Sequence, residues 1–309
     1  MNARIRVGVV GLGQWGQHHV RIYKHMPGVD LVGVVDTAAR ETSAFARRYQ
    51  TAGYQDYREL FGKVDAVSLV VPTALHYEVA REFLQHGVHL LVEKPITTTV
   101  DQAADLIEIA ARQGVTLLVG HVERFKPSVQ ALREYVTEPL FVQVRRVRPW
   151  NPRRVMDVGV VLDLMIHDLD IILTLMRSPV SRVSAIGAAI HGDDEDLAVA
   201  HLSLENGCLA SFVASRVSPV KAAELEITLH DGLVHLNYLT QQMTVVRRGV
   251  ERKTMLKGEE PLRAELAHFL DCVRGEARPL VPGEHGLRAL EVAQQILGRM
   301  TMITPRVAV

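Results

Sequence analysis

The clearest candidates for chemistry are a lysine and, far from it in the sequence, an aspartate–histidine pair. Lys94 stands in Leu90-Leu-Val-Glu93-Lys94-Pro95, an apolar run that ends in two charges and a proline. Such runs are typical of buried strands, and because Pro95 cannot donate to a sheet ladder, the strand must end there. In a parallel sheet this end opens onto the crevice where ligands bind. Lys94 is therefore a candidate to meet a substrate, and a solvated lysine at a strand end is the alternative.

The pair lies in a helix predicted over 159–176, which is apolar nearly all round and is therefore expected to be buried. Asp163 and His167 are four residues apart and share one face. An aspartate there can hold a ring nitrogen of the histidine and prepare it as a general base. A structural, mutually satisfied pair is the alternative, and Asp168 and Asp170 are interpreted as structural or capping. Too few further ligands are present for a metal site, so none is predicted.

A glycine-rich turn near the N-terminus predicts a dinucleotide site. The β-branched run 5–10 leads directly into Gly11-Leu-Gly13-Gln-Trp-Gly16, and a helix and a second strand ending in Asp36 follow. Gly11 makes the tight turn, Gly13 lets the backbone approach a pyrophosphate, and Gly16 permits close helix packing. Amides at the helix start can then bind phosphate. Asp36 would bind both ribose hydroxyls and repel a 2′-phosphate, which favours NAD over NADP.

Other residues are expected at the cofactor as well. Arg40 could weaken the preference for NAD, because its charge lies close to Asp36 in the sequence. His76, at a helix start, is also open to a local structural role, and His18 and His19 are interpreted as helix surface or partial core. The remaining predicted cofactor contacts are Gln14, Trp15, Pro72, Thr73, His76, Glu93 and Lys94.

Strands and helices alternate through the first part of the chain, which predicts a Rossmann-type, doubly wound parallel sheet over residues 1–122. Residues 123–309 are predicted to form an α+β domain with an open, mostly antiparallel sheet. Its strands are expected near 141–148, 182–190, 196–204, 208–217, 223–230, 233–239 and 242–248, and its helices near 125–135, 159–176, 259–274 and 284–301. Asn206-Gly207 and Asp231-Gly232 predict hairpins with type I′ turns.

Composition limits the classes of function. A length of 309 residues favours two domains. The 35 basic side chains balance the 35 acidic ones, so no bulk charge favours nucleic acid or an anionic membrane. Two distant cysteines suit a reducing compartment and exclude a disulfide framework. Without a signal sequence or an apolar run of the ~20 residues that span a membrane, a cytoplasmic location is expected.

Two further patterns concern partners and substrate. Several strands of the second domain are apolar on both faces, which favours a homodimer or homotetramer formed through this sheet. The stretch Arg145-Arg-Val-Arg148-Pro-Trp150-Asn-Pro-Arg153-Arg154 is strongly basic. Arginine forks match phosphate oxygens and Trp150 could stack on a base or sugar, although a solvated loop is equally consistent. The predicted substrate contacts are Lys94, His121, Arg124, Arg146, Arg148, Asp163 and His167.

Over essentially its whole length the sequence resembles the glucose–fructose oxidoreductase/inositol dehydrogenase family. The resemblance rests on Gly11-Leu-Gly13-Gln-Trp-Gly16, on Glu93-Lys94-Pro95 and on Gly159-Val-Val-Leu-Asp163-Leu-Met-Ile-His167-Asp-Leu-Asp. It implies that Lys94 is the catalytic lysine, that Asp163 and His167 are the acid–base pair, and that the Lys94–Pro95 bond is cis. One departure is Thr73, where many members have asparagine after the proline.

Within the family, Gly120-His-Val-Glu-Arg-Phe and Asp163-Leu-Met-Ile-His167 are most similar to dehydrogenases of the 3-hydroxyl of UDP-N-acetylglucosamine. The resemblance thus implies NAD-dependent oxidation of a sugar hydroxyl, in which His167 takes the proton, Lys94 hydrogen-bonds the oxygen and Asp163 orients His167. A dehydrogenase of a free sugar or polyol, and a catalytically silent NAD-sensing regulator, remain as alternatives.

Overall fold

The computed structural model describes residues 4–152 and 157–304, and it divides the chain into two compact units. The first unit comprises Met1–Val122 and Glu259–Leu287, and the second comprises Glu123–Gly258 and Arg288–Val309. The boundary after Val122 coincides with the predicted one. The segment Glu259–Leu287 belongs to the first unit, whereas the sequence had suggested a second domain that is continuous in sequence.

The first unit is built on a parallel six-stranded sheet of order β3-β2-β1-β4-β5-β6, which confirms the predicted doubly wound fold. Its strands are β1 (Ile5–Val10), β2 (Val29–Val35), β3 (Ala52–Tyr54), β4 (Ala66–Leu69), β5 (His89–Glu93) and β6 (Leu117–Gly120). The helices are α1 (Gln14–Lys24), α2 (Ala39–Tyr49), α3 (His76–Gln85), α4 (Val100–Gln113), α7 (Pro261–Val273) and the start of α8 (Gly283–Gly298). Short 3₁₀ turns are η1 (Tyr57–Leu60) and η2 (Thr73–Leu75), and η3 (Val122–Phe125) spans the boundary to the second unit.

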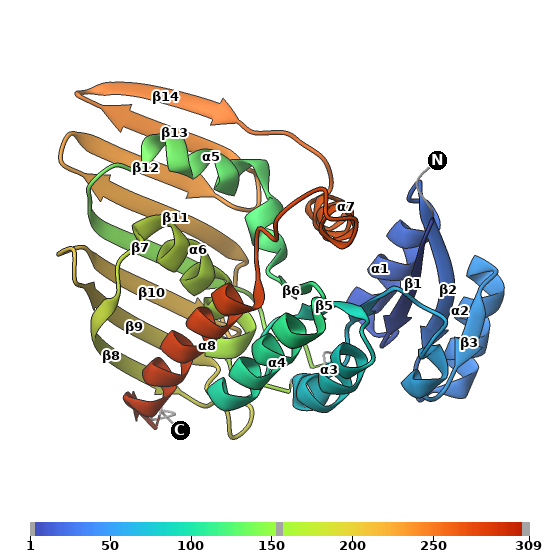
Figure 1. Cartoon of the computed structure of the whole chain (residues 1–309). Coiled ribbons are helices and arrows are strands. Elements are labelled where there is room, and N and C mark those ends of the chain that lie inside the picture. Colours follow the sequence, from blue (N-terminus) through green and yellow to red (C-terminus); the bar gives the residue numbers. More distant parts are fainter. Residues whose placement is uncertain (1–3, 153–156, 305–309) are drawn as a thin grey trace. The chain divides into compact units, whose positions relative to one another are not determined.

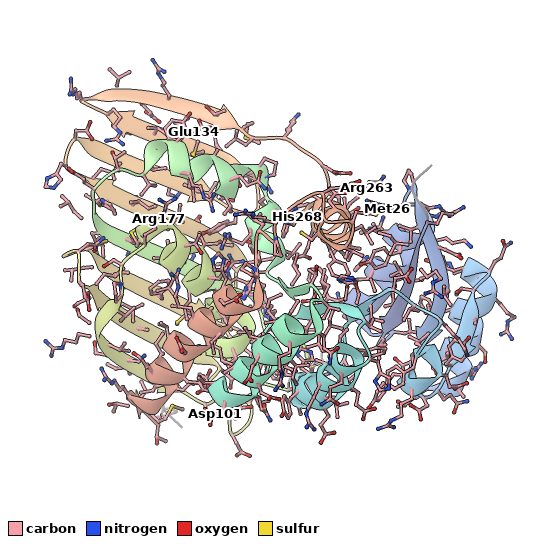
Figure 2. All side chains as sticks on the ribbon, viewed as in Figure 1. Met26, Asp101, Glu134, Arg177, Arg263 and His268 are labelled. Atoms are coloured by element: carbon pink, nitrogen blue, oxygen red, sulfur yellow. The ribbon has the colours of Figure 1, made fainter. Side chains whose placement is uncertain are left out.

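Helices cover this sheet in two groups. The helices α1 and α2 contact each other and the strands β1, β2 and β3, whereas α3 and α4 contact each other, with α3 packed on β4 and β5 (Figure 1). Helix α7 also belongs here because Leu262, Leu266 and Phe269 enter the apolar core formed with β1, α1 and β2. Figure 2 shows Arg263 of α7 near Met26, which follows α1, and both line a small cavity. This packing explains why the segment after Glu259 returns to the first unit.

The second unit contains a nine-stranded, mostly antiparallel sheet, as predicted, of order β14-β13-β12-β11-β7-β10-β9-β8-β15. Its strands are β7 (Pro139–Val147), β8 (Val180–Ala188), β9 (Leu197–Leu204), β10 (Leu209–Ser215), β11 (Ala222–Leu229), β12 (Gly232–Asn237), β13 (Gln242–Arg247), β14 (Val250–Met255) and β15 (Met300–Met302). The pairs β7–β10 and β8–β15 are parallel. The sequence analysis did not predict β14, which is exposed along its whole length, or the three-residue β15.

One face of this second sheet carries α5 (Pro127–Tyr135), α6 (Ile166–Met176) and the C-terminal part of α8 (Figure 1). The other face presents a cross-strand row in which Ile186 pairs with Val199, Val199 with Val213, and Val213 with Arg145. Ile186 and Arg145 are exposed, whereas Val199 and Val213 are half-buried. Arg145 therefore projects from the face opposite α6.

Both predicted hairpins form, but the predicted type I′ turns are wrong. A type I′ turn needs positive φ at both central residues. In the first hairpin only Gly207 is left-handed (φ 86°), while the Asn206 side chain accepts a hydrogen bond from Cys208 N at 3.1 Å. In the second, Gly232 pairs with Leu229 and has no positive φ. A Cβ at Gly232 would overlap the carbonyl oxygen of Val246, so this glycine serves close strand approach instead.

Candidate active site

Lys94 follows directly on β5, which lies between β4 and β6 in the parallel sheet. The side chain is half-buried, and the Lys94–Pro95 peptide bond is cis, as the resemblance implied. The main-chain N–H of Lys94 donates to Glu93 Oε2 at 3.3 Å. Lys94 thus stands at the sheet edge where ligands of doubly wound folds bind.

His76 begins α3 and is almost fully buried, at 1% exposure. Its Nδ1 lies 2.8 Å from the carbonyl oxygen of Pro95, and its Nε2 lies 3.0 Å from the carbonyl oxygen of Val71. The ring therefore links the loop after β4 to the loop after β5. These two contacts give His76 the local structural role that the sequence left open. Its predicted contact with the cofactor stays a prediction.

The residues of the predicted dinucleotide site lie together in the first unit. Gly11, Gly13, Asp36 and Pro72 line one cavity of about 590 Å³. Gly11 has φ +95°, and a Cβ there would lie 2.3 Å from the carbonyl oxygen of Val70. The Asp36 carboxylate accepts hydrogen bonds from the N–H groups of Leu12 (2.7 Å) and Ala38 (3.0 Å).

These features fit a dinucleotide. A Cβ at Gly16 would lie 1.9 Å from the carbonyl oxygen of Gly11, so the turn must be glycine-rich to pack this closely. The start of α1 has no side-chain cap, so its amide groups remain able to receive phosphate. Gln14 and Trp15 are exposed beside this turn, and Thr73 is buried at η2. The cavity, the glycine turn and the acidic residue after β2 together satisfy the requirements of the predicted cofactor.

Asp163 and His167 lie where the second unit's buried helix begins. Asp163 is in the π-helical turn η4 (Val161–Met165), and His167 is in the first turn of α6. The sequence predicted one continuous α-helix and not this π-helical turn, a feature that is frequent at functional sites. Asp163 is 5% exposed, and its Oδ2 accepts a hydrogen bond from Arg148 Nη2 at 2.7 Å. His167 is half-buried and thus more accessible than most of its helix.

A glutamate from another loop anchors the start of this turn. Glu195, just before β9, accepts a hydrogen bond from Val161 N through Oε1 (2.9 Å), and its main-chain oxygen accepts one from Val160 N (3.0 Å). Burial raises the pKa of Glu195. A Cβ at Gly159 would lie 2.2 Å from this carboxyl group, so Gly159 makes room for it. The sequence analysis missed Glu195, since no local pattern connects it to the helix.

Two of the predicted substrate-binding arginines are engaged inside the second unit. Arg146 forms a two-pronged contact with Asp168 (2.7 and 2.8 Å) and a further bond to Glu123 (3.1 Å). Arg124 is 4% exposed and donates to Asp170 at 3.2 Å. Asp168 and Asp170 are therefore structural partners, as interpreted from sequence. The predicted substrate contacts of Arg124 and Arg146 would require these ion pairs to be exchanged.

The rest of the basic stretch is divided among different environments. Trp150 stacks on His191 with ring centroids 4.1 Å apart, and Arg216 lies 5.7 Å above its ring. Arg153 and Arg154 fall outside the described residues. His121, buried just after β6, belongs to the first unit. Each unit thus assembles its own set of predicted residues: Lys94 and the dinucleotide turn in the first, and the Asp163–His167 pair with Arg148 in the second.

Comparison with known proteins agrees with this arrangement of folds. Residues 5–121 match the model of an oxidoreductase family with an NAD-binding Rossmann fold, and residues 133–235 match the C-terminal domain model of the same family. The UDP-N-acetylglucosamine 3-dehydrogenase of Acidithiobacillus ferrooxidans is 32% identical over 94% of this chain and 96% of its own length. The scyllo-inositol 2-dehydrogenase (NAD(+)) of Bacillus subtilis is 25% identical, with coverage of 94% and 93%.

Solved structures extend the comparison. A structure of the Acidithiobacillus ferrooxidans enzyme superposes with a TM-score of 0.91 and 32% identity, over 97% of this chain and 98% of that one. A 3-ketoreductase from Actinomadura kijaniata, solved with TDP-benzene and NADP, gives a TM-score of 0.88 at 20% identity, with coverage of 97% and 99%, and shares the fold. The chain belongs to the glucose–fructose oxidoreductase/inositol dehydrogenase family, and it is a dehydrogenase by class.

Among the described residues, no helix is both long and apolar enough to cross a membrane.

Proposed function

We propose that the protein is an NAD-dependent dehydrogenase that oxidises a secondary hydroxyl of a sugar, namely the 3-hydroxyl of UDP-N-acetylglucosamine. The observation that carries the proposal is the placement of Asp163 and His167, four residues apart at the start of a buried helix, with Arg148 hydrogen-bonded to Asp163. An acid–base pair of this kind serves proton abstraction from an alcohol. The full-length similarity to a UDP-N-acetylglucosamine 3-dehydrogenase supports the choice of substrate.

Each of three residues has a distinct role in the proposal. His167 accepts the hydroxyl proton, and Asp163 orients the imidazole and stabilises its charged form. Lys94 hydrogen-bonds the same oxygen and supplies preorganised positive charge as negative charge develops there. The nicotinamide ring, when bound, supplies the hydride acceptor. The proposal thus assigns Lys94 and His167 to the same reacting oxygen of the substrate.

The preference for NAD rests on Asp36. Its carboxylate follows β2 and lines the same cavity as Gly11 and Gly13. A 2′-phosphate in this position would meet a like charge, whereas two ribose hydroxyls would find an acceptor. Replacing Asp36 with serine is expected to reduce the ratio of kcat/KM for NAD to that for NADP, measured with the same sugar substrate.

A free polyol is the second candidate substrate. The inositol dehydrogenase relative favours it, and so does the engagement of Arg124 and Arg146 in internal ion pairs, because those arginines are then not available to a phosphate. A regulator that binds NAD but catalyses no reaction has less support. Such a protein would not need to retain all three of Lys94, Asp163 and His167 in its sequence.

A substrate panel separates these possibilities. The purified protein is mixed with UDP-N-acetylglucosamine, N-acetylglucosamine, UDP-glucose or inositol, each with NAD and with NADP, and formation of the reduced cofactor is followed by absorbance. The proposal predicts the highest kcat/KM for UDP-N-acetylglucosamine with NAD. A higher value for inositol would replace the substrate assignment, and no turnover with any alcohol, together with tight NADH binding, would favour the regulator.

We also propose that two or four copies associate through the outward face of the second unit's sheet. The row Ile186, Val199 and Val213 presents apolar side chains there. Replacement of Ile186 by lysine is expected to lower the molar mass measured by light scattering. The cytoplasmic location inferred from the sequence stays a prediction.

A further inference from the structure

Both residues that flank Lys94 contact buried histidines from different helices. His19, in α1, is fully buried, and its Nε2 lies 3.3 Å from Oε1 of Glu93. His76, in α3, brings Nδ1 to 2.8 Å from the carbonyl oxygen of Pro95. A buried imidazole is costly unless its nitrogens meet polar partners. His76 meets this requirement through the main-chain oxygens of Pro95 and Val71, whereas His19 has the approach to the Glu93 carboxylate without hydrogen-bond geometry. The two rings thus contact the residues on either side of Lys94 from different helices.

The carboxylate of Glu93 is confined from further directions. Its Oε2 accepts the main-chain N–H of Lys94. On the neighbouring strand β6, Gly120 pairs with Glu93, and a Cβ at Gly120 would lie 3.0 Å from the carboxyl carbon. Glycine at this position leaves the carboxylate the space it occupies. The position of Glu93 is thus tied to that of the residue that follows it.

A second carboxyl group completes this cluster. Glu265 of α7 is fully buried, and neither of its carboxyl oxygens has a hydrogen-bond partner in the described part of the chain. Burial raises the pKa of Glu265 well above its ordinary value, and the negative charge of Glu93 raises it further. Burial and the charge of Glu93 therefore both favour the protonated form of Glu265.

Other titratable groups lie on the elements next to Glu93. Tyr23 of α1 is fully buried and shares a hydrogen bond of 2.9 Å with Ser68 of β4, and burial raises its pKa. Lys94 follows Glu93 along the chain, and His121 follows Gly120 after β6. With His19 of α1 and Glu265 of α7, these groups face the carboxylate or lie next to it along the chain.

We propose that His19, acting through Glu93, and His76, acting through Pro95, are positioning residues that fix the side chain of Lys94. The proposal deepens the function proposed above, because it rests on Lys94 as the residue that contacts the substrate. Neither histidine touches the reacting atoms in this account. Each acts on the main chain or the carboxylate next to the lysine.

The test reads the lysine itself and needs no substrate. Full-length protein is exposed to limiting acetic anhydride over a range of pH, and acetylation of Lys94 is quantified by peptide mass spectrometry against exposed lysines as internal standards. Melting temperature and NADH fluorescence titration establish that each variant is folded. The variants are His19→Asn and His76→Asn, with the exposed His25→Asn and His86→Asn as controls from the same two helices.

We call the contacts of His19 with Glu93 and of His76 with Pro95 the clamp. If the clamp fixes Lys94, His19→Asn and His76→Asn should each change the Lys94 acetylation rate by at least about threefold, because the reactivity of an amine follows its pKa and its placement. The two control substitutions should leave this rate unchanged. Combining His19→Asn with Glu93→Gln should have no larger effect than the larger single substitution. If His19→Asn does not fold, Glu93→Gln alone replaces it, with the same threshold. Smaller changes in the folded variants would overturn the proposal.

Activity gives a second, separable readout. With UDP-N-acetylglucosamine and NAD, both clamp variants are expected to lose roughly 10–100-fold in kcat, the scale of a small misplacement of a catalytic group, while NADH affinity stays within about threefold. If the wild type shows no turnover but the acetylation rates change as predicted, the proposed function fails and the clamp stands. If turnover is normal and acetylation is unchanged, the clamp fails and the function stands.

Discussion

Buried carboxyl groups have different surroundings in the two units. In the second unit Glu123, Asp163, Asp168, Asp170 and Asp196 are buried and each contacts an arginine, whereas Glu195 is buried and accepts a main-chain hydrogen bond instead. In the first unit the fully buried Glu265 has no hydrogen-bond partner among the described residues, and burial and the charge of Glu93 raise its pKa. A nearby arginine favours the charged form of a buried carboxyl group, whereas burial without a cation favours the neutral form. Ion pairs thus hold these five carboxylates of the second unit, while Glu265 is buried without one.

Glu123 and Glu265 are therefore expected to contribute to stability with opposite dependences on pH. Burial would raise the pKa of Glu123, but the charges of Arg146 and Lys126 lower it, so its contribution to stability is present above pH ~4.5 and is lost as the pH falls through the lowered value. Because the pKa of Glu265 is raised, its contribution to stability changes with pH in the opposite direction. Its protonated form stabilises the folded state relative to an ionised unfolded chain only at low pH, and stability declines as the pH rises above ~4.5.

The largest expected effect comes from removing an arginine. Arg146→Met leaves Asp168 and Glu123 buried without their shared cation, and we expect it to cost ~3–5 kcal/mol of unfolding free energy. Arg145→Met is the matched control, since Arg145 is the exposed neighbour on the opposite face of the same strand, and its cost should stay below ~0.5 kcal/mol. Denaturant unfolding, with hydrogen exchange assigned to each unit, makes the measurement. Equal costs for the two substitutions would contradict the ion-pair account.

The next largest effect concerns how the unfolding free energy of the first unit changes with pH. Glu265→Gln keeps the shape of the neutral acid but cannot ionise in the unfolded chain. We therefore expect it to remove a decline of up to ~1.4 kcal/mol per pH unit between pH ~5 and the raised folded pKa. Unfolding free energy is measured from pH 5 to 8 by hydrogen exchange in α7. Glu108→Gln, whose side chain is 67% exposed, is the control and should keep the wild-type slope. A wild-type slope in Glu265→Gln would contradict its burial as a neutral acid.

The smallest expected effect is the loss of stability on removing the N-terminal cap of α4. Thr99 caps α4 in the first unit, where its Oγ1 accepts a hydrogen bond from Gln102 N at 3.3 Å. Thr99→Ala should cost ~1 kcal/mol, whereas Thr98→Ala, at the exposed preceding position, should cost less. A thermal or denaturant titration distinguishes the two. If Thr98→Ala proves the more harmful, the cap has been assigned to the wrong residue.

The sequence predicted the first unit better than the second unit's site, and the reason is physical. Strand, glycine turn, helix and acid follow one another locally, so Gly11 through Asp36 could be placed from spacing alone. The helix bearing Asp163 and His167 was also visible because polar residues interrupt an apolar segment. The partners of these residues were not visible. Arg148 and Glu195 contact this helix start from other segments of the chain. The burial of Glu265 in the first unit was not visible either, because burial is set by tertiary packing that no local period encodes.

Some of those partners left a weak signal. Glu265 stands within the apolar face formed by Leu262, Leu266 and Phe269, which is unusual for a charged residue. His19, one turn after Gly16, shares the buried face of α1. The packing of α7 in the first unit left no signal in the sequence. An apolar helical face shows that a helix is buried, but it does not indicate which core the helix joins.

The central claim is that Lys94 and His167 carry the oxidation. The most direct measurement is steady-state NADH formation from NAD and UDP-N-acetylglucosamine by the wild type, Lys94→Met and His167→Ala, with NADH binding measured in parallel. The account predicts that kcat falls by about 10²–10⁴-fold in each variant, while NADH binding is retained. Full activity in both variants would contradict it.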